Sequence, residues 1–239
     1  MNNLILVIPA HNPRPELPSI ISSIRDRLQG IVVVNDGSDP EYERIFQECG
    51  RNAWVLTHSR NRGMGAALKT GFRFALDDLH ADGIVAADAD GQHAPEDILS
   101  VASALRRSPE SVVIGVRDFD GAPFLNRAGN MLFRWVHRLC MGWELTDTQT
   151  GLRAWPRDAA IRNLEPKPDG MDYQQECLVR ITERVIQVPI RTIYIDGNKG
   201  SHQRPIRNSL LILLVFLRHI WNRRSKERSS LFPLPQQSE

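Results

Sequence analysis

The sequence predicts an α/β fold in which helices cover both faces of a mostly parallel, Rossmann-like sheet. Three observations support this fold class. The chain has 239 residues, which is long enough for one large α/β domain or two small ones. Short apolar runs alternate with longer segments of helical spacing, and polar residues directly follow four of the runs.

The expected strands are apolar runs of four or five residues, and the expected helices are longer segments between them. Turn-forming or polar residues bound each run, as is usual for buried strands. The expected strands are 4–8, 31–34, 53–56, 84–87 and 112–116. The expected helices are 15–28, 41–49, 65–79 and 95–106.

Polar clusters follow four of the expected strands, and we expect them to meet at one edge of the sheet. They are Pro9–Asn12 after the first strand, Asn35–Ser38 after the second, Asp88 with Asp90 after the fourth, and Arg117 after the fifth. Sheets of this class bind ligands beyond the carboxyl ends of their strands. The sequence therefore predicts a nucleotide site at this edge.

The segment Ile84–Pro95 contains the most informative of these clusters, an apolar run that leads into Asp88 and Asp90. Two carboxylates held this close repel one another unless a cation or a shared proton lies between them. Mg²⁺ commonly takes one or two carboxylates together with substrate phosphates. The motif therefore indicates a metal–diphosphate site, and a polar turn that ends the strand is the alternative.

Other phosphate-binding patterns fit the sequence less well. It contains no Walker-type loop. Gly63 and Gly65 begin an expected helix, and a helix N-terminus can hold an anion. They do not follow the first strand, which argues against a dinucleotide-dependent dehydrogenase. A close packing contact is an equally good interpretation of both glycines.

The C-terminal region is basic and amphipathic. Residues 204–228 contain seven Lys or Arg against one Glu, and the apolar run 210–217 lies among them. A bilayer span needs about 20 apolar residues, so this run suits a helix at a membrane interface. A helix packed on the core is the alternative, and nucleic acid is not expected as a partner because stacking aromatics are few. We divide the chain into a catalytic domain, 1–203, a basic amphipathic helix, 204–228, and a disordered tail, 229–239.

Taken together, these motifs resemble those of the inverting glycosyltransferases of family 2, which have the GT-A fold for nucleotide-sugar donors. The first half carries this resemblance in Ile8–Asn12, Val34–Ser38, Asn61–Ala66 and Asp88–Gln92. The second half resembles the polyprenyl-phosphate branch, which includes dolichol-phosphate mannose synthase, in Asp147–Arg153, Val188–Tyr194 and Gly200–Ser209. The resemblance implies metal-dependent transfer of a hexose-type sugar from a UDP- or GDP-linked donor to a polyprenyl phosphate.

The resemblance also implies the roles of individual residues. The nucleotide sugar would be bound by Pro9, Ala10, Asn12, Asp36, Asp88, Ala89 and Asp90, and Mg²⁺ or Mn²⁺ by Asp88, Asp90 and Gln92. The acceptor phosphate would be bound by Arg117, Arg127, His202 and Arg204, and the catalytic residues would be Asp88, Asp90, Arg117 and Asp147. Pro13 and Asn35 depart from the family pattern near the base, so both UDP and GDP stay open.

The expected acceptor explains why the chain needs no obvious general base. A phosphomonoester is mostly dianionic at neutral pH, whereas a hydroxyl of a glycan or lipid would need a base, for which Asp147 and Glu176 are candidates. We expect no signal peptide, and we expect a peripheral protein on the inner face of the cytoplasmic membrane, served by a separate flippase. A nucleotidyltransferase and a catalytically silent binding module are the alternative classes.

Overall fold

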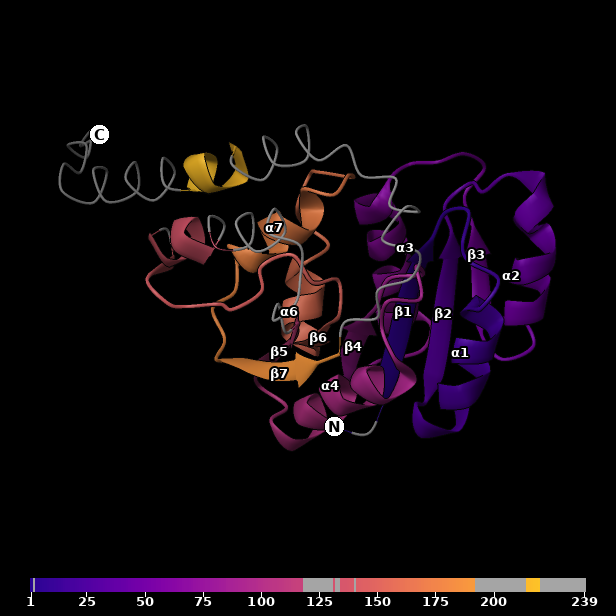
Figure 1. Cartoon of the computed structure of the whole chain (residues 1–239), viewed down its shortest axis with the longest axis horizontal. Coiled ribbons are helices and arrows are strands. Elements are labelled where there is room, and N and C mark those ends of the chain that lie inside the picture. The colour runs from indigo at the N-terminus through magenta and orange to yellow at the C-terminus, as the bar shows by residue number, and fades with distance from the viewer. Residues whose placement is uncertain (2, 118–130, 132–133, 140, 192–213, 220–239) are drawn as a thin grey trace, which may run out of the picture.

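A computed structural model describes residues 1, 3–117, 131, 134–139, 141–191 and 214–219 of the chain (Figure 1). The described residues form a seven-stranded sheet with the strand order β3-β2-β1-β4-β6-β5-β7. The strands are β1 (Leu4–Ala10), β2 (Gly30–Asn35), β3 (Trp54–Thr57), β4 (Gly83–Ala86), β5 (Val112–Arg117), β6 (Arg153–Pro156) and β7 (Val185–Ile190). Strand β6 is antiparallel to both of its neighbours, β4 and β5, and the other pairs are parallel.

Helices cover both faces of the sheet. One face carries α1 (Leu17–Ile24), α2 (Glu43–Cys49) and α4 (Pro95–Arg107), and the other carries α3 (Met64–Asp77), α6 (Arg157–Arg162) and α7 (Tyr173–Leu178). Short 3₁₀ turns extend α1 at Arg25–Arg27 and precede α2 at Pro40–Tyr42. This arrangement confirms the predicted α/β class with a mostly parallel sheet.

Strand β1 lies between β2 and β4, and its burial explains why the strands of this sheet are continuous apolar runs. All seven of its residues are buried, because helices cover both of its faces. Leu4, Leu6 and Ile8 belong to the core beneath α1 and α4, whereas Ile5 and Val7 belong to the core beneath α3. A strand buried on both faces is expected to be apolar at every position rather than at alternate ones.

The five strands and four helices expected in the first half are all present, with ends that differ by a few residues. The sheet also contains β6 and β7, which the apolar-run pattern did not predict. Strand β6 has four residues and begins with the buried Arg153, so it lacks the apolar run by which the others were found.

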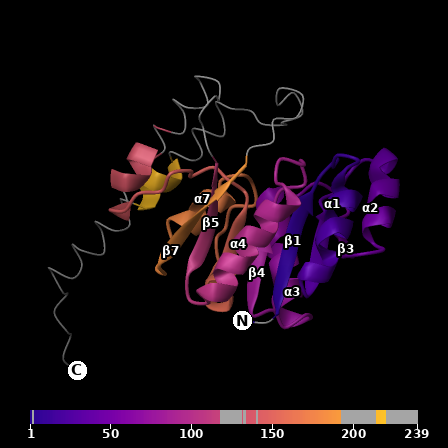
Figure 2. The same ribbon diagram turned by 60° about the horizontal axis from the view of Figure 1, so that its bottom comes forward.

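Residues 214–219 are helical, and they are the described part of the segment 204–228, for which a helix was expected. Val215 and Phe216 are buried against Val136 and Met141, next to helical residues 134–139. Both segments lie at the β7 end of the sheet in two views, far from β3 (Figure 2). None of the described helices is long and apolar enough to cross a membrane.

Candidate functional site

The predicted residues that the structure describes gather at one edge of the sheet. The parallel strands β1, β2, β4 and β5 all end at this edge. Strand β6 lies between β4 and β5 and runs the other way, so the loop that precedes it, residues 147–152, reaches the same edge. This loop lies between the acidic residues that follow β4 and Arg117 at the end of β5.

Asp88 and Asp90 follow β4 in a turn rather than in the strand itself. Strand β4 ends at Ala86, and the turn continues through Gly91, which has a φ of 76°. Asp90 Oδ1 accepts a hydrogen bond from the backbone N–H of Gln92 at 3.0 Å. His93 is buried and places Nε2 3.7 Å from Asp88 Oδ2. The turn, not the alternation of a strand, therefore brings the two carboxylates together.

The two carboxylates differ in their electrostatic surroundings. Burial opposes ionisation of Asp88, but the neighbouring His93 ring and the charges of Arg153 and Arg117 outweigh it and lower the pKa of Asp88. Burial, together with the negative charge of Asp88, raises the pKa of Asp90. At Asp90, burial and the charge of Asp88 outweigh the positive charges of His93 and Arg117, so the pKa of this carboxyl stays raised.

The chemistry of these side chains fits a hard divalent cation bound together with a diphosphate. The described residues contain no cluster of three or more His, Cys, Asp or Glu that could enclose a metal by themselves. Two carboxylates and the amide oxygen of Gln92 would supply part of a ligand set. Mg²⁺ and similar ions accept such a set when substrate phosphates and water complete the shell.

Arg117 is held by a buried carboxylate. Its Nε donates to Asp147 Oδ2 at 2.6 Å, and its Nη2 donates to Asp147 Oδ1 at 3.1 Å. Asp147 is 0% exposed and also accepts the backbone N–H of Gln149 at 3.0 Å. This forked geometry fixes the plane of the guanidinium at the sheet edge. Asp147 is therefore placed to orient Arg117, and its burial and bonding do not suit a general base.

Gly151 packs directly against Asp88. A Cβ atom at this position would lie 2.0 Å from Asp88 Oδ2 and 2.4 Å from its Cγ. Any Cβ atom here would displace the Asp88 carboxylate, so a glycine leaves that carboxylate in its present position. The loop before β6 therefore contacts Asp88 through Gly151 and Arg117 through Asp147.

Asp36, the expected nucleotide contact, is buried and bonded within the protein. Its carboxylate is hydrogen-bonded to His58 Nδ1 at 2.7 Å and accepts the backbone N–H groups of Arg62 at 2.9 Å and Gly63 at 2.7 Å. The opposite ring nitrogen of His58 is 2.9 Å from Thr70 Oγ1. This geometry makes Asp36 the anchor of the loop that precedes α3, and direct contact with the nucleotide stays a prediction.

The other expected donor-binding residues shape the loops after β1 and β2. Asn12 has a positive φ of 51°, and its side-chain amide donates to Asp39 Oδ2 and accepts from the backbone N–H of Asp39. Pro9 and Ala10 are buried in β1, and Ala89 is half-buried beside the acidic pair. Of the expected acceptor-binding residues, Arg127, His202 and Arg204 lie outside the described residues.

The N-terminus of α3 is closed by the chain itself. The backbone N–H of Gly65 donates to the carbonyl of Asp169 at 2.8 Å, and a Cβ at Gly65 would lie 2.6 Å from the Cβ of Tyr173. A Cβ at Gly63 would lie 2.4 Å from the same carbonyl oxygen. The packing interpretation of both glycines is therefore supported.

Sequence reasoning missed four residues that support the site: His58, His93, Gly151 and Arg153. For His93, adjacency to the acidic motif was a usable signal. For Gly151 and Arg153, the signal was their place in the segment that resembles the polyprenyl-phosphate branch. The bond between His58 and Asp36 joins residues 22 positions apart and left no local pattern.

Comparisons with known proteins show the family and the fold. The family model of glycosyl transferase family 2 matches residues 5–162. A UDP-N-acetylglucosamine–dolichyl-phosphate N-acetylglucosaminyltransferase of Methanococcus voltae is 28% identical, with 81% of this chain and 86% of that protein covered. An undecaprenyl-phosphate mannosyltransferase of Micrococcus luteus is also 28% identical, with 78% and 82% covered. Among solved structures, glucosyl-3-phosphoglycerate synthase of Mycobacterium tuberculosis, in complex with Mn²⁺, UDP and phosphoglyceric acid, matches with a TM-score of 0.70 at 17% identity, covering 92% of this chain and 78% of its own.

Proposed function

The chain belongs to glycosyl transferase family 2, and on this premise we propose that it transfers a hexose-type sugar from a UDP- or GDP-linked donor to a polyprenyl phosphate. The transfer depends on Mg²⁺ or Mn²⁺ and inverts the anomeric centre. One observation carries the proposal: the acidic pair Asp88 and Asp90 lies at the same sheet edge as the ion pair of Arg117 with the buried Asp147. Relatives named for transfer to dolichyl and undecaprenyl phosphate support the acceptor class.

On the donor side, Asp88, Asp90 and Gln92 are the residues that would hold the cation. When bound, such a cation acts as a Lewis acid that neutralises charge developing on the departing nucleoside diphosphate. Asp88 is suited to this task because the neighbouring positive groups favour its ionised form and lower its pKa despite its burial. The loop anchored by Asp36 borders the same edge and would position the nucleotide.

On the acceptor side, Arg117 would bind the phosphate of the lipid. A guanidinium pairs well with phosphate oxygens, and Asp147 holds this one in a fixed plane. An oxygen of the dianionic acceptor attacks the anomeric carbon, and the bond from that carbon to the β-phosphate oxygen of the donor breaks. The electron pair leaves with the nucleoside diphosphate, so no base has to remove a proton.

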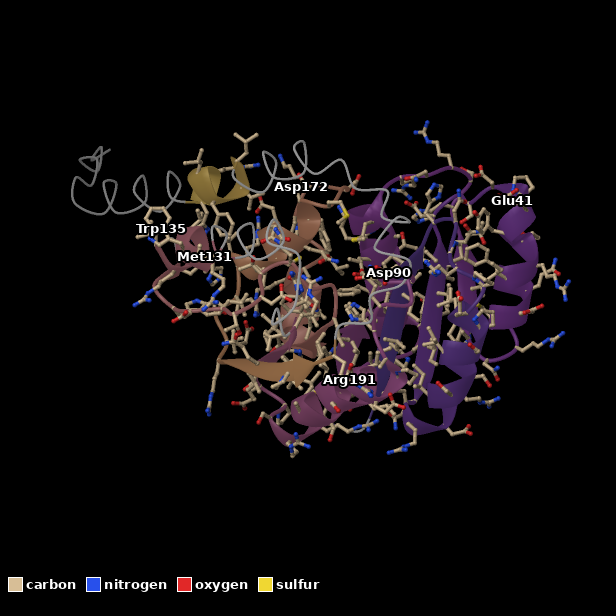
Figure 3. The ribbon with its side chains drawn as sticks, in the orientation of Figure 1. Glu41, Asp90, Met131, Trp135, Asp172 and Arg191 are labelled. Atoms are coloured by element: carbon tan, nitrogen blue, oxygen red, sulfur yellow. The ribbon has the colours of Figure 1, made fainter. Side chains whose placement is uncertain are left out.

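An exposed apolar surface gives the lipid a place to approach. Met131, Trp135 and Leu139 are 67%, 62% and 64% exposed and are spaced by four residues, which places them on one face of a helix. Leu214 and Leu217, on the adjacent helical segment, are 59% and 53% exposed. We call these five residues the apolar surface. Figure 3 shows Met131 and Trp135 close together at one end of the molecule.

The apolar surface supports peripheral attachment to a membrane. Exposed Trp and Leu side chains beside basic residues are typical of helices that lie in a bilayer interface. Arg138 lies on the same helical segment, where its side chain is 69% exposed, and Arg218 lies next to Leu217. We further propose that the protein works on the cytoplasmic face of the membrane and that a separate flippase moves the product.

A donor panel tests the proposed function. Purified protein is incubated with Mn²⁺, short-chain polyprenyl phosphate and radiolabelled UDP- and GDP-sugars, each in turn. We expect one donor to give an organic-soluble product that a chelator and Asp90→Asn both abolish. Asp26→Asn, at a site where the side chain is 86% exposed, is the matched control and keeps full activity. Donor hydrolysis without lipid product would contradict the polyprenyl-phosphate acceptor.

A further inference from the structure

Arg153 is a buried arginine directly beneath the site, and the mechanism above does not use it. It begins β6, is 2% exposed and pairs with Ala86 of β4 and Ile114 of β5. The side chain lines a small, mostly apolar cavity with Phe72 and Trp155. Among the described residues, no carboxylate lies within ion-pair distance of its guanidinium. Burial lowers the pKa of Arg153 to about 10, so it stays charged at neutral pH.

The guanidinium joins two separate parts of the chain. Its Nη1 donates to the carbonyl of Gln174 in α7 at 2.7 Å, and its Nη2 donates to the carbonyl of Thr148 at 3.2 Å. Gln175 reinforces the connection, because its Nε2 donates to the same Thr148 carbonyl at 2.8 Å. Arg153 and α7 together therefore fix the backbone of residues 147–152.

A buried charge that makes no close ion pair is costly for folding, and at Arg153 burial outweighs the more distant charges of Asp147 and Asp88. The effective penalty is several kcal/mol, and an apolar residue of similar volume is often as stable or more stable. Stability alone therefore does not explain an arginine at this position. The loop that it holds contains Asp147, which orients Arg117, and Gly151, which touches Asp88.

We propose that Arg153 is a positioning residue for sugar transfer, which ties residues 147–152 to α7 and so fixes Asp88 and Arg117 relative to one another. Its positive charge also lies beneath the edge where the anionic diphosphate would bind. The proposed effect of Arg153 on Arg117 rests on the proposed function. The proposed effect of Arg153 on Asp88 concerns cation binding, which can be measured without any substrate.

Two substitutions test this role against a purely structural one. Arg153→Met keeps the approximate volume and removes the charge, whereas Arg153→Lys keeps the charge and loses the fork. Arg157→Met is the matched control, because Arg157 also donates to backbone carbonyls, those of Ala81 and Leu76, but at the other end of β6. Thermal unfolding fixes a temperature at which all variants are folded.

The main readout is Mn²⁺ affinity without nucleotide, measured by loss of the free-ion electron paramagnetic resonance signal. Residues that orient metal ligands typically change affinity by about 10- to 100-fold when replaced. We expect weakening towards about 100-fold in Arg153→Met and about tenfold in Arg153→Lys. Arg157→Met keeps wild-type affinity. Hydrogen exchange at residues 147–152 speeds up in both Arg153 variants and stays slow in the control.

A kinetic readout separates positioning from folding. At saturating Mn²⁺, we expect kcat for transfer to fall about tenfold or more in Arg153→Met. Asp88 and Arg117 remain misplaced even when every cation site is occupied. Wild-type Mn²⁺ affinity and wild-type exchange in a folded Arg153→Met or Arg153→Lys protein would overturn the inference. If the wild-type protein binds Mn²⁺ but forms no lipid product, the proposed function fails, and the affinity and exchange data still decide the role of Arg153.

Discussion

The contact between Gly151 and Asp88 leads to a sharp prediction for Gly151→Ala. The new Cβ would lie 2.0 Å from Asp88 Oδ2, whereas ordinary contact begins at 3.4 Å. The carboxylate must therefore move by about 1.4 Å. It is able to move because it is the end of a side chain that is 25% exposed, so the fold itself is spared.

The size of the functional loss follows from this displacement. Protein metal sites hold their ligand distances within about 0.2 Å, and a misplacement of about 1 Å in a catalytic arrangement can cost about 100-fold in rate. We expect kcat/KM for Gly151→Ala to fall by at least about 100-fold, which equals about 2.7 kcal/mol of transition-state stabilisation. The free energy of unfolding should change by less than about 1 kcal/mol.

Two measurements on the same protein check this prediction. Denaturant unfolding gives the stability change, and Mn²⁺ titration with transfer kinetics gives the functional change. Gly50→Ala is the control, since a Cβ there meets its nearest atoms at 3.5 Å and the residue lies at the end of α2. Wild-type Mn²⁺ affinity and kcat/KM in Gly151→Ala would refute the placement of Asp88 in the cation site.

Three further predictions concern other parts of the structure. Asp36→Ala leaves three hydrogen-bond donors without their acceptor. The free energy of unfolding, measured by urea denaturation, should therefore fall by about 3 kcal/mol. A loss below about 1 kcal/mol would contradict the anchoring role of Asp36. Trp135→Glu should weaken binding to anionic vesicles by about tenfold or more in sedimentation assays, whereas Trp54→Glu, 45% exposed on β3 at the far end of the sheet, should leave it unchanged. Asp90 has a raised pKa in the folded state, so its ionised form destabilises the metal-free fold at neutral pH. Asp90→Asn should therefore raise the metal-free Tm at pH 7.5, and this gain should disappear as the pH falls into the ordinary carboxyl range; an unchanged Tm would contradict the raised pKa.

The sheet of the first half could be predicted because its strands are buried on both faces and are therefore apolar throughout. Strand β6 could not, since it is short and places Arg153 inside the protein, where a charged residue is not expected. Its antiparallel direction is nevertheless what brings residues 147–152 to the site. Sequence pattern thus located the edge of the sheet but not the loop that completes it.

The candidate site shows the same division between local and long-range information. Asp88 and Asp90 could be recognised together because they lie in one short motif. The ion pair between Arg117 and Asp147 joins residues 30 positions apart, and the sequence assigned Asp147 a catalytic role without its partner. Asp36 was expected at the nucleotide, but the structure shows three internal bonds that only the folded chain brings together.

The acceptor is tested most directly by a competition between polyprenyl phosphate and the free polyprenol of the same chain length. Both are offered to the purified protein with the active donor and Mn²⁺, and the products are separated by mass. We predict that the phosphate is preferred by at least about 100-fold. A hydroxyl acceptor needs a general base in the site to remove its proton, and such a base contributes about 10²- to 10⁴-fold to the rate. Arg117→Met should lower transfer to the phosphate. Equal or preferred transfer to the polyprenol would contradict the phosphate acceptor and the role of Arg117.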